Sequence, residues 1–127
     1  MGQQQLLLII LSVLIVGVAI AVGITIYNTW SVQSNKDGLM NDLNGISSLA
    51  YGYYSRAQIM GGGNGTYVGF DVSTAIKSNE NGDVTWTVSG DGKSITFLAT
   101  SRYGFGTVST VMSNQGILTN FVFTGEF

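Results

Sequence analysis

The sequence contains no cysteine, no histidine and no proline among its 127 residues. These absences exclude disulfides and thiol chemistry, and they remove the usual zinc ligand pairs and the commonest general base. Charge is also scarce, since only 9% of the residues are charged and the net charge is −2. The five Lys and Arg residues are scattered, so no basic face could neutralise the phosphates of a nucleic acid. We expect no enzyme, no cofactor, no metal site and no nucleic-acid partner.

What the chain does contain is one long apolar run, from Leu6 to Ile26. Its 21 residues include no charged side chain, and only Ser12 and Thr25 are polar. At a rise of ~1.5 Å per residue, a helix of this length spans about 31 Å, which matches the hydrocarbon thickness of a bilayer. The run therefore predicts a helix that lies in lipid or in an equally apolar protein interior.

Small residues repeat inside this run at a spacing of four. Gly17 pairs with Ala21, and Ala19 pairs with Gly23. Such pairs let the backbone of a second helix approach closely, although small residues are also common in membrane helices that make no such contact. The pairs mark a candidate surface for helix packing.

The apolar run has three interpretations. The first is a secretory signal, because Ala19-Ile20-Ala21 fits the A-x-A cleavage pattern, but the preceding MGQQQ carries no positive charge. The second is a permanent single-span anchor for a small outer domain. The third is an assembly helix that stays in the mature protein and packs against copies of itself. The sequence beyond the run bears on this choice.

A helical pattern continues beyond the run. Residues 27–60 contain no proline, and apolar or small residues recur at intervals of four and three. These positions are Leu39, Leu43, Ile46, Ala50, Tyr53 and Ala57. We predict a helix over about 6–59. It is either continuous or kinked and restarted at residues 33–38, where Ser34 and Asp37 form a weak capping box.

Three glycines accompany this apolar stripe at a spacing of seven: Gly38, Gly45 and Gly52. Each costs about 1 kcal/mol relative to alanine inside a helix. We expect them to form a groove without side chains, where a sheet or a neighbouring helix packs closely; the alternative is local flexibility. The predicted helix–sheet contact comprises Gly38, Leu39, Leu43, Gly45, Ile46, Ala50, Gly52 and Tyr53.

A glycine-rich loop, MGGGNGTYVGF, ends the predicted helix. It lacks the Lys-Ser/Thr pair of a phosphate-binding loop, and it follows a helix instead of opening one, which argues against a nucleotide site. The triplet Asn64-Gly65-Thr66 in this loop is a glycosylation sequon. Asn64 is therefore a candidate modification site in a host that glycosylates.

The pattern then changes to a period of two. Residues 83–90 and 93–101 alternate apolar with polar side chains about a Ser-Gly-Asp-Gly turn, and residues 107–113 and 117–127 form a second such pair. Residues 68–78 fit a strand, a short helix or a loop. We predict an α+β fold in which a four-stranded antiparallel sheet packs on the amphipathic half of the long helix.

The predicted organisation has two parts. An apolar N-terminal helix occupies residues 1–30, and a globular head occupies residues 31–127. The head is divided into an amphipathic helix over 31–60, a glycine-rich loop over 61–70 and a sheet region over 71–127.

This order of elements resembles a type IV pilin. The likeness covers the whole chain as an architecture, and LLLIILSVLIVGVAIAVGITIY carries it in the sequence. It implies a major pilin that waits in the inner or cytoplasmic membrane and is then assembled by pilus machinery into an extracellular filament of identical subunits. The other hypothesis is a single-span, membrane-anchored surface domain that acts as a binding or adhesion module.

Two features depart from the pilin pattern. No basic leader precedes Gly2, and Gln5 stands where mature pilins typically carry glutamate, if Met1 is the mature start. A carboxamide in an apolar core needs hydrogen bonds but no counter-charge. We therefore expect Gln3, Gln4 and Gln5 to form a neutral network at the buried end of the helix, or else a polar cap at the membrane interface. With the small pairs, these glutamines form the predicted assembly surface.

Overall fold

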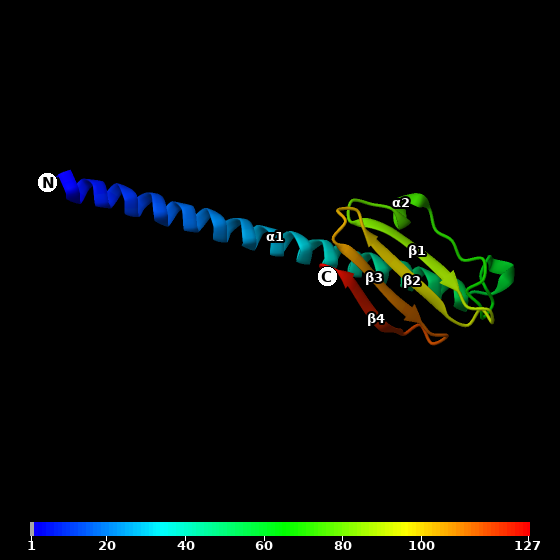
Figure 1. Ribbon diagram of the computed structural model, residues 1–127. Helices are drawn as coiled ribbons and strands as arrows, with labels where there is room; N and C mark the ends of the chain where they lie inside the picture. The colour runs from blue at the N-terminus through cyan, green and yellow to red at the C-terminus, as the bar shows by residue number, and fades with distance from the viewer. Residues whose placement is uncertain (1) are drawn as a thin grey trace. The chain divides into compact units, whose positions relative to one another are not determined.

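The computed structural model describes residues 2–127. Its elements are, in order, α1 (Gly2–Ser55), the 3-10 helix η1 (Gln58–Met60), α2 (Thr74–Lys77), β1 (Gly82–Val88), β2 (Ile95–Ser101), β3 (Gly106–Met112) and β4 (Leu118–Gly125). One long helix followed by four antiparallel strands confirms the predicted α+β fold (Figure 1). The chain divides into two compact units, Met1–Val32 and Gln33–Phe127, and the second is called the head below.

The helix α1 includes residues 33–38 without interruption. Gln33 Nε2 donates to Asp37 Oδ1 at 2.9 Å, an i,i+4 pair that lies along the helix surface. Of the two expectations for this stretch, the uninterrupted helix is therefore the one observed. The polar residues here change the helix surface but do not start a second helix.

The C-terminal end of α1 lies at Ser55, about one turn before the predicted end. Ala57 is extended, with φ −64° and ψ 148°, and this stops the helix. Gly61 then follows η1 in the left-handed conformation, at φ 81°, where its N–H donates to Gln58 O. The predicted glycine cap therefore ends η1 and not α1; at Gly61 it adopts the left-handed conformation without the steric cost of a Cβ.

The sheet has the strand order β1-β2-β3-β4, and each strand pairs antiparallel with the next. Both predicted hairpins are present. The undecided residues 68–78 form a loop that contains α2. The pairing of β3 with β4 shifts between Ser109 and Val111, beside Asn120, whose φ is 55°. This non-glycine residue in the left-handed region marks a bulge that the sequence pattern does not predict.

The core of the head lies between one face of the sheet and the C-terminal part of α1 (Figure 1). Alternate residues of β2, namely Ile95, Phe97 and Ala99, are fully buried, and those between them are exposed. The helix contributes a buried stripe of Leu39, Leu43, Ile46 and Ala50. Tyr53 is half-buried and packs against this core. The predicted helix residues Leu39, Leu43, Ile46, Ala50 and Tyr53 therefore all contact the core of the head.

Buried polar groups join α1 to the rest of the head. Asn35 Nδ2 donates to Asn81 O at 2.9 Å, and Ser101 Oγ donates to Asn35 Oδ1 at 2.6 Å. Two turns later, Asp42 Oδ2 accepts a hydrogen bond from Asn79 Nδ2 at 2.8 Å. Among the described residues, no buried side-chain nitrogen or oxygen lacks a partner. The head therefore satisfies its own buried polar side chains.

The three spaced glycines of α1 do not behave alike. A Cβ at Gly38 would lie 2.7 Å from the side-chain amide of Asn81, which would have to shift away from its hydrogen bond to Asp42 Oδ2. Gly45 and Gly52 are exposed, and a Cβ at either would meet nothing within 4 Å. The predicted helix–sheet packing at Gly45 and Gly52 is thus not made.

Helix geometry explains this difference. At ~100° per residue, Gly38 lies about 110° around the helix from the centre of the buried stripe. A repeat of seven then drifts by ~20° with each step, so Gly45 and Gly52 turn progressively away from the sheet.

Candidate functional site

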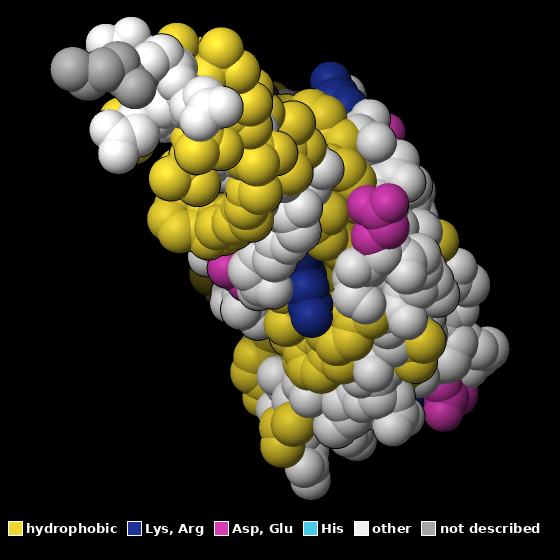
Figure 2. Space-filling view, turned by 60° about the vertical axis from the view of Figure 1, so that its left-hand side comes forward, with side chains coloured by type: hydrophobic (Ala, Val, Ile, Leu, Met, Phe, Trp, Pro, Cys, Tyr) yellow, Lys and Arg dark blue, Asp and Glu magenta, His cyan; other side chains and the backbone are white. Residues whose placement is uncertain are grey.

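The surface of the first unit is apolar on every side. Its large hydrophobic residues between 6 and 26 are all exposed, from 49% at Ile10 to 66% at Leu7 and Val13. Among the described residues, α1 is the one helix long and apolar enough to cross a membrane, and nothing buries its most apolar window. Figure 2 shows hydrophobic side chains gathered along the face of this helix that is turned to the viewer. Such a surface is stable only when lipid or protein covers it.

Three hydroxyl side chains of this unit bond to backbone carbonyls inside the helix. Ser12 Oγ donates to Leu8 O at 2.8 Å, and Thr25 Oγ1 donates to Ala21 O at 3.1 Å. Thr29 Oγ1 donates to Thr25 O at 3.0 Å in the same way. Such i−4 bonds occupy the hydroxyl donors. These residues can therefore enter an apolar environment without leaving an unpaired donor.

The predicted small pairs lie on nearly opposite sides of the helix. Gly17 and Ala21 share one side, and Ala19 and Gly23 lie about 200° around it, at ~100° per residue. A Cβ at Gly17 or Gly23 would meet nothing within 4 Å, so both positions are open to an approaching helix. The helix thus offers two separate surfaces of close approach.

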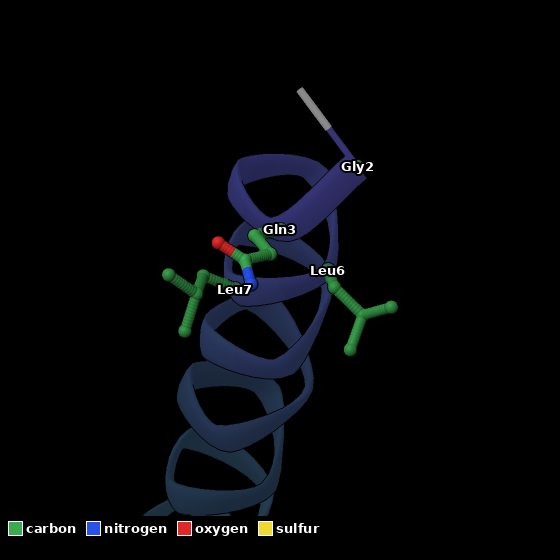
Figure 3. A pocket seen from close by; sticks show the side chains of 4 residues that line it. All are labelled: Gly2, Gln3, Leu6 and Leu7. Atoms are coloured by element: carbon green, nitrogen blue, oxygen red, sulfur yellow. The ribbon is translucent and has the colours of Figure 1, made fainter.

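Three glutamines mark the N-terminal end of this helix. Gln3, Gln4 and Gln5 are exposed on its first turns. Figure 3 shows the Gln3 amide beside Leu7 on one side of the helix and Leu6 on the other. The hollow between these side chains is open helix surface, not an enclosed cavity. A neutral network among glutamines of different copies stays a prediction.

Pattern analysis missed two aromatic residues at the other end of the apolar run. Tyr27 is 72% exposed and Trp30 is 74% exposed. Their signal in the sequence is their position, because tyrosine and tryptophan are enriched where a membrane helix leaves the hydrocarbon.

Two exposed carboxyls of the head, Asp71 and Asp91, have local structural partners. The Lys77 ammonium, 3.2 Å from Asp71 Oδ1, lowers the pKa of that exposed carboxyl, with help from the Val72 N–H. Hydrogen bonds from the Ser89 hydroxyl and the Lys93 N–H lower the pKa of Asp91 in the β1–β2 turn. No group of three or more Asp and Glu residues that could hold a metal occurs within residues 2–127. None of these groups forms a recognisable reactive cluster.

The sequon residue Asn64 lies in the loop after η1. It is exposed and adopts the left-handed conformation, with φ 51°. The Thr66 hydroxyl of the same triplet donates to Gly63 O at 3.0 Å. Asn64 is therefore accessible, and its modification stays a prediction.

Comparison of the chain with protein-family models, with curated proteins and with solved structures yields no match. The long apolar N-terminal helix and the small four-stranded antiparallel sheet nevertheless make a pilin-like architecture. The two features that bear on function are the uncovered apolar helix and the head, which buries a core of its own.

Proposed function

We propose that this chain is the structural subunit, the major pilin, of a type IV pilus-like extracellular filament. The apolar N-terminal helix holds the subunit in the membrane before assembly and forms the filament core afterwards. One observation carries the proposal: the apolar part of α1 is wholly exposed in the single chain. The head has a core of its own and does not use that surface.

The two small-residue surfaces favour a continuing assembly over a closed dimer. A helix with a single small-residue surface can pack closely against only one partner helix, which gives a dimer. The pairs Gly17/Ala21 and Ala19/Gly23 lie nearly opposite each other, so each helix can contact two neighbours at short distance. Unlike surfaces that meet head to tail build an open helical array when the rotation does not close.

A membrane-anchored binding module is the competing function. Such a module is typically joined to its anchor by a flexible linker rich in glycine, serine or proline. Residues 27–37 are instead helical and contain neither glycine nor proline. In the head, the hollow lined by Phe70, Asp71, Lys77 and Trp86 is shallow and open to solvent. These observations favour the structural subunit.

Assembly of the purified full chain tests the proposal. After removal of detergent, we expect filaments in negative-stain electron microscopy. Gly17→Leu and Gly23→Leu each fill one small-residue surface, and each should reduce filament yield at least tenfold. Val16→Leu and Val22→Leu add bulk beside those surfaces and serve as matched controls. A chain that stays monomeric, or glycine variants that assemble as well as the valine variants, would count against the proposal.

A further inference from the structure

We infer that Tyr27 and Trp30 form an aromatic anchor that fixes the depth of the helix in a phospholipid bilayer, with both rings at the level of the lipid headgroups. The partner of this surface is therefore the bilayer interface, where acyl chains give way to glycerol and phosphate. The inference rests on the proposed function only in assuming that the helix enters a bilayer before assembly.

The position of the two rings supports this anchor. They follow directly on the apolar run that ends at Ile26, whose 21 residues span about 31 Å as a helix. With Leu6 at one hydrocarbon boundary, the other boundary falls at Ile26, because the hydrocarbon core is about 30 Å thick. Tyr27 then lies at the boundary, and Trp30 lies about 5 Å beyond it, within the headgroup layer.

The exposure of the rings supports it independently. Tyr27 and Trp30 are 72% and 74% exposed, whereas Tyr67 and Phe97 in the head are fully buried. The two exposed rings are three residues apart, so they project from the same side of the helix, about 60° from each other. Each combines a large apolar ring with one polar N–H or O–H group, which suits an interface that is apolar on one side and wet on the other.

The lack of nearby charge makes the rings the main determinant of depth. Lysine and arginine commonly anchor the ends of membrane helices by reaching the headgroups. Between Gly2 and Asn35 this helix has no charged side chain, and the first charged residue is Lys36. At the other end, the change from Gln3 to Leu6 and Leu7 takes place within about one turn (Figure 3). The helix is thus framed by amides at one end and aromatic rings at the other.

Depth-dependent fluorescence quenching tests this anchor. The chain has two tryptophans, so Trp86→Phe makes Trp30 the single reporter. We reconstitute the full chain in phosphatidylcholine vesicles whose acyl chains carry bromine at a shallow, a middle or a deep carbon. Trp30 should be quenched at least twofold more by the shallow bromine than by the deep one. Strongest quenching by the deep bromine, or no quenching by any, would overturn the anchor.

Two further variants make the result independent of the head. Trp86 is half-buried and packs against the core of the head, so Trp30→Phe is measured as well, and its quenching is subtracted from that of the unchanged chain. This difference reports Trp30 without any change in the head. Ile15→Trp combined with Trp30→Phe and Trp86→Phe places the reporter about 22 Å deeper along the helix, near the middle of the hydrocarbon. It should be quenched most by the deep bromine, and equal profiles for positions 15 and 30 would refute a fixed depth.

The anchor and the filament can fail separately. A chain whose Trp30 lies at headgroup depth but which never assembles would refute the proposed filament and leave the anchor intact. A chain that assembles, but whose Trp30 lies deep in the hydrocarbon or stays in water, would refute the anchor alone.

Discussion

At the scale of single residues, the head depends on a few buried polar contacts as much as on its apolar core. Asn35 is 4% exposed and bonds both the Asn81 carbonyl and the Ser101 hydroxyl. Because it is the first buried residue of α1, these bonds fix where the helix begins to contact the sheet. Its side chain acts here as a structural connector.

Asn35→Ala should therefore destabilise the head by about 1–3 kcal/mol, because the Ser101 hydroxyl loses its acceptor and the Asn81 carbonyl keeps only the Arg102 N–H as a donor. Urea unfolding of the full chain in detergent, followed by Trp86 fluorescence in a Trp30→Phe background, measures the loss. Asn44→Ala changes an exposed asparagine of the same helix and is the matched control. Equal midpoints for the two variants would show that the Asn35 bonds contribute nothing.

Tyr67 should limit the stability of the head at high pH. Burial, followed by the nearby hydroxyls of Tyr54 and Tyr51, raises the pKa of Tyr67 from 10.0 to about 12. The neutral phenol donates to Ser113 O at 2.7 Å. A raised pKa of the folded state means that the stabilisation is complete below pH 10 and is lost as the pH rises from 10 to about 12.

Tyr67→Phe should flatten this loss of stability between pH 10 and 12, and it should cost about 1 kcal/mol at neutral pH by removing the hydrogen bond. Urea midpoints measured from pH 7 to 12 show both effects. Tyr103→Phe, at a residue that is 63% exposed, is the control. If the Tyr67→Phe chain loses stability with pH as steeply as the Tyr103→Phe chain, the buried phenol does not set the limit.

At the scale of secondary-structure elements, the periodicity of the sequence predicts much of the fold. Alternation in β2 places Ile95, Phe97 and Ala99 in the core, and the 4-3 spacing in α1 places Leu39 and Leu43 there. These features are local, so they can be read from neighbouring residues.

Features that depend on tertiary contacts escape such pattern analysis. The bulge at Asn120 depends on how β4 pairs with β3, and the burial of Tyr67 depends on its loop crossing over the core. The different surroundings of Gly38 and Gly45 depend on how far around the helix the sheet reaches. Tyr27 and Trp30 belong to no periodic pattern of buried residues. Only their position directly after the apolar run marks them as candidate interface residues.

Replacing each of the three glycines of α1 by alanine should change the stability of the head differently. Gly45→Ala and Gly52→Ala should each stabilise the head by about 0.5–1 kcal/mol, because both lie in open space within a helix. Gly38→Ala should destabilise it, because the new Cβ would lie 2.7 Å from Asn81. Urea unfolding of the three variants ranks them, and a destabilising Gly45→Ala would contradict the exposed position. Should the two stabilised variants assemble poorly, Gly45 and Gly52 would be contacts between neighbouring copies.

Gln5 tests whether the N-terminal amides do more than cap the helix. If they form neutral hydrogen bonds between copies, Gln5→Leu should raise the concentration needed for assembly about tenfold, equivalent to ~1.4 kcal/mol per subunit. Sedimentation of assembled protein over a concentration series measures this, with Gln5→Asn as the variant that retains the amide. Unchanged assembly of Gln5→Leu would reduce the glutamines to a polar cap.

At the scale of the whole molecule, the two units differ in whether they bury their own apolar surface. The head buries its own core and pairs its buried polar side chains. The apolar run leaves its surface uncovered, and its Ser12 and Thr25 hydroxyls bond inside the helix. One unit is complete as a single chain, and the other becomes stable only in lipid or among copies of itself.

Helical reconstruction by cryo-electron microscopy, on filaments of the full chain sheared from producing cells or assembled after detergent removal, tests the central claim most directly. The proposal predicts that residues 6–26 of every subunit lie in the filament core, with the small pairs at the closest helix contacts and the heads outside. A filament held together by the heads, with residues 6–26 exposed at its surface, would contradict it. So would a chain that remains a monomer in lipid and forms no filament at all.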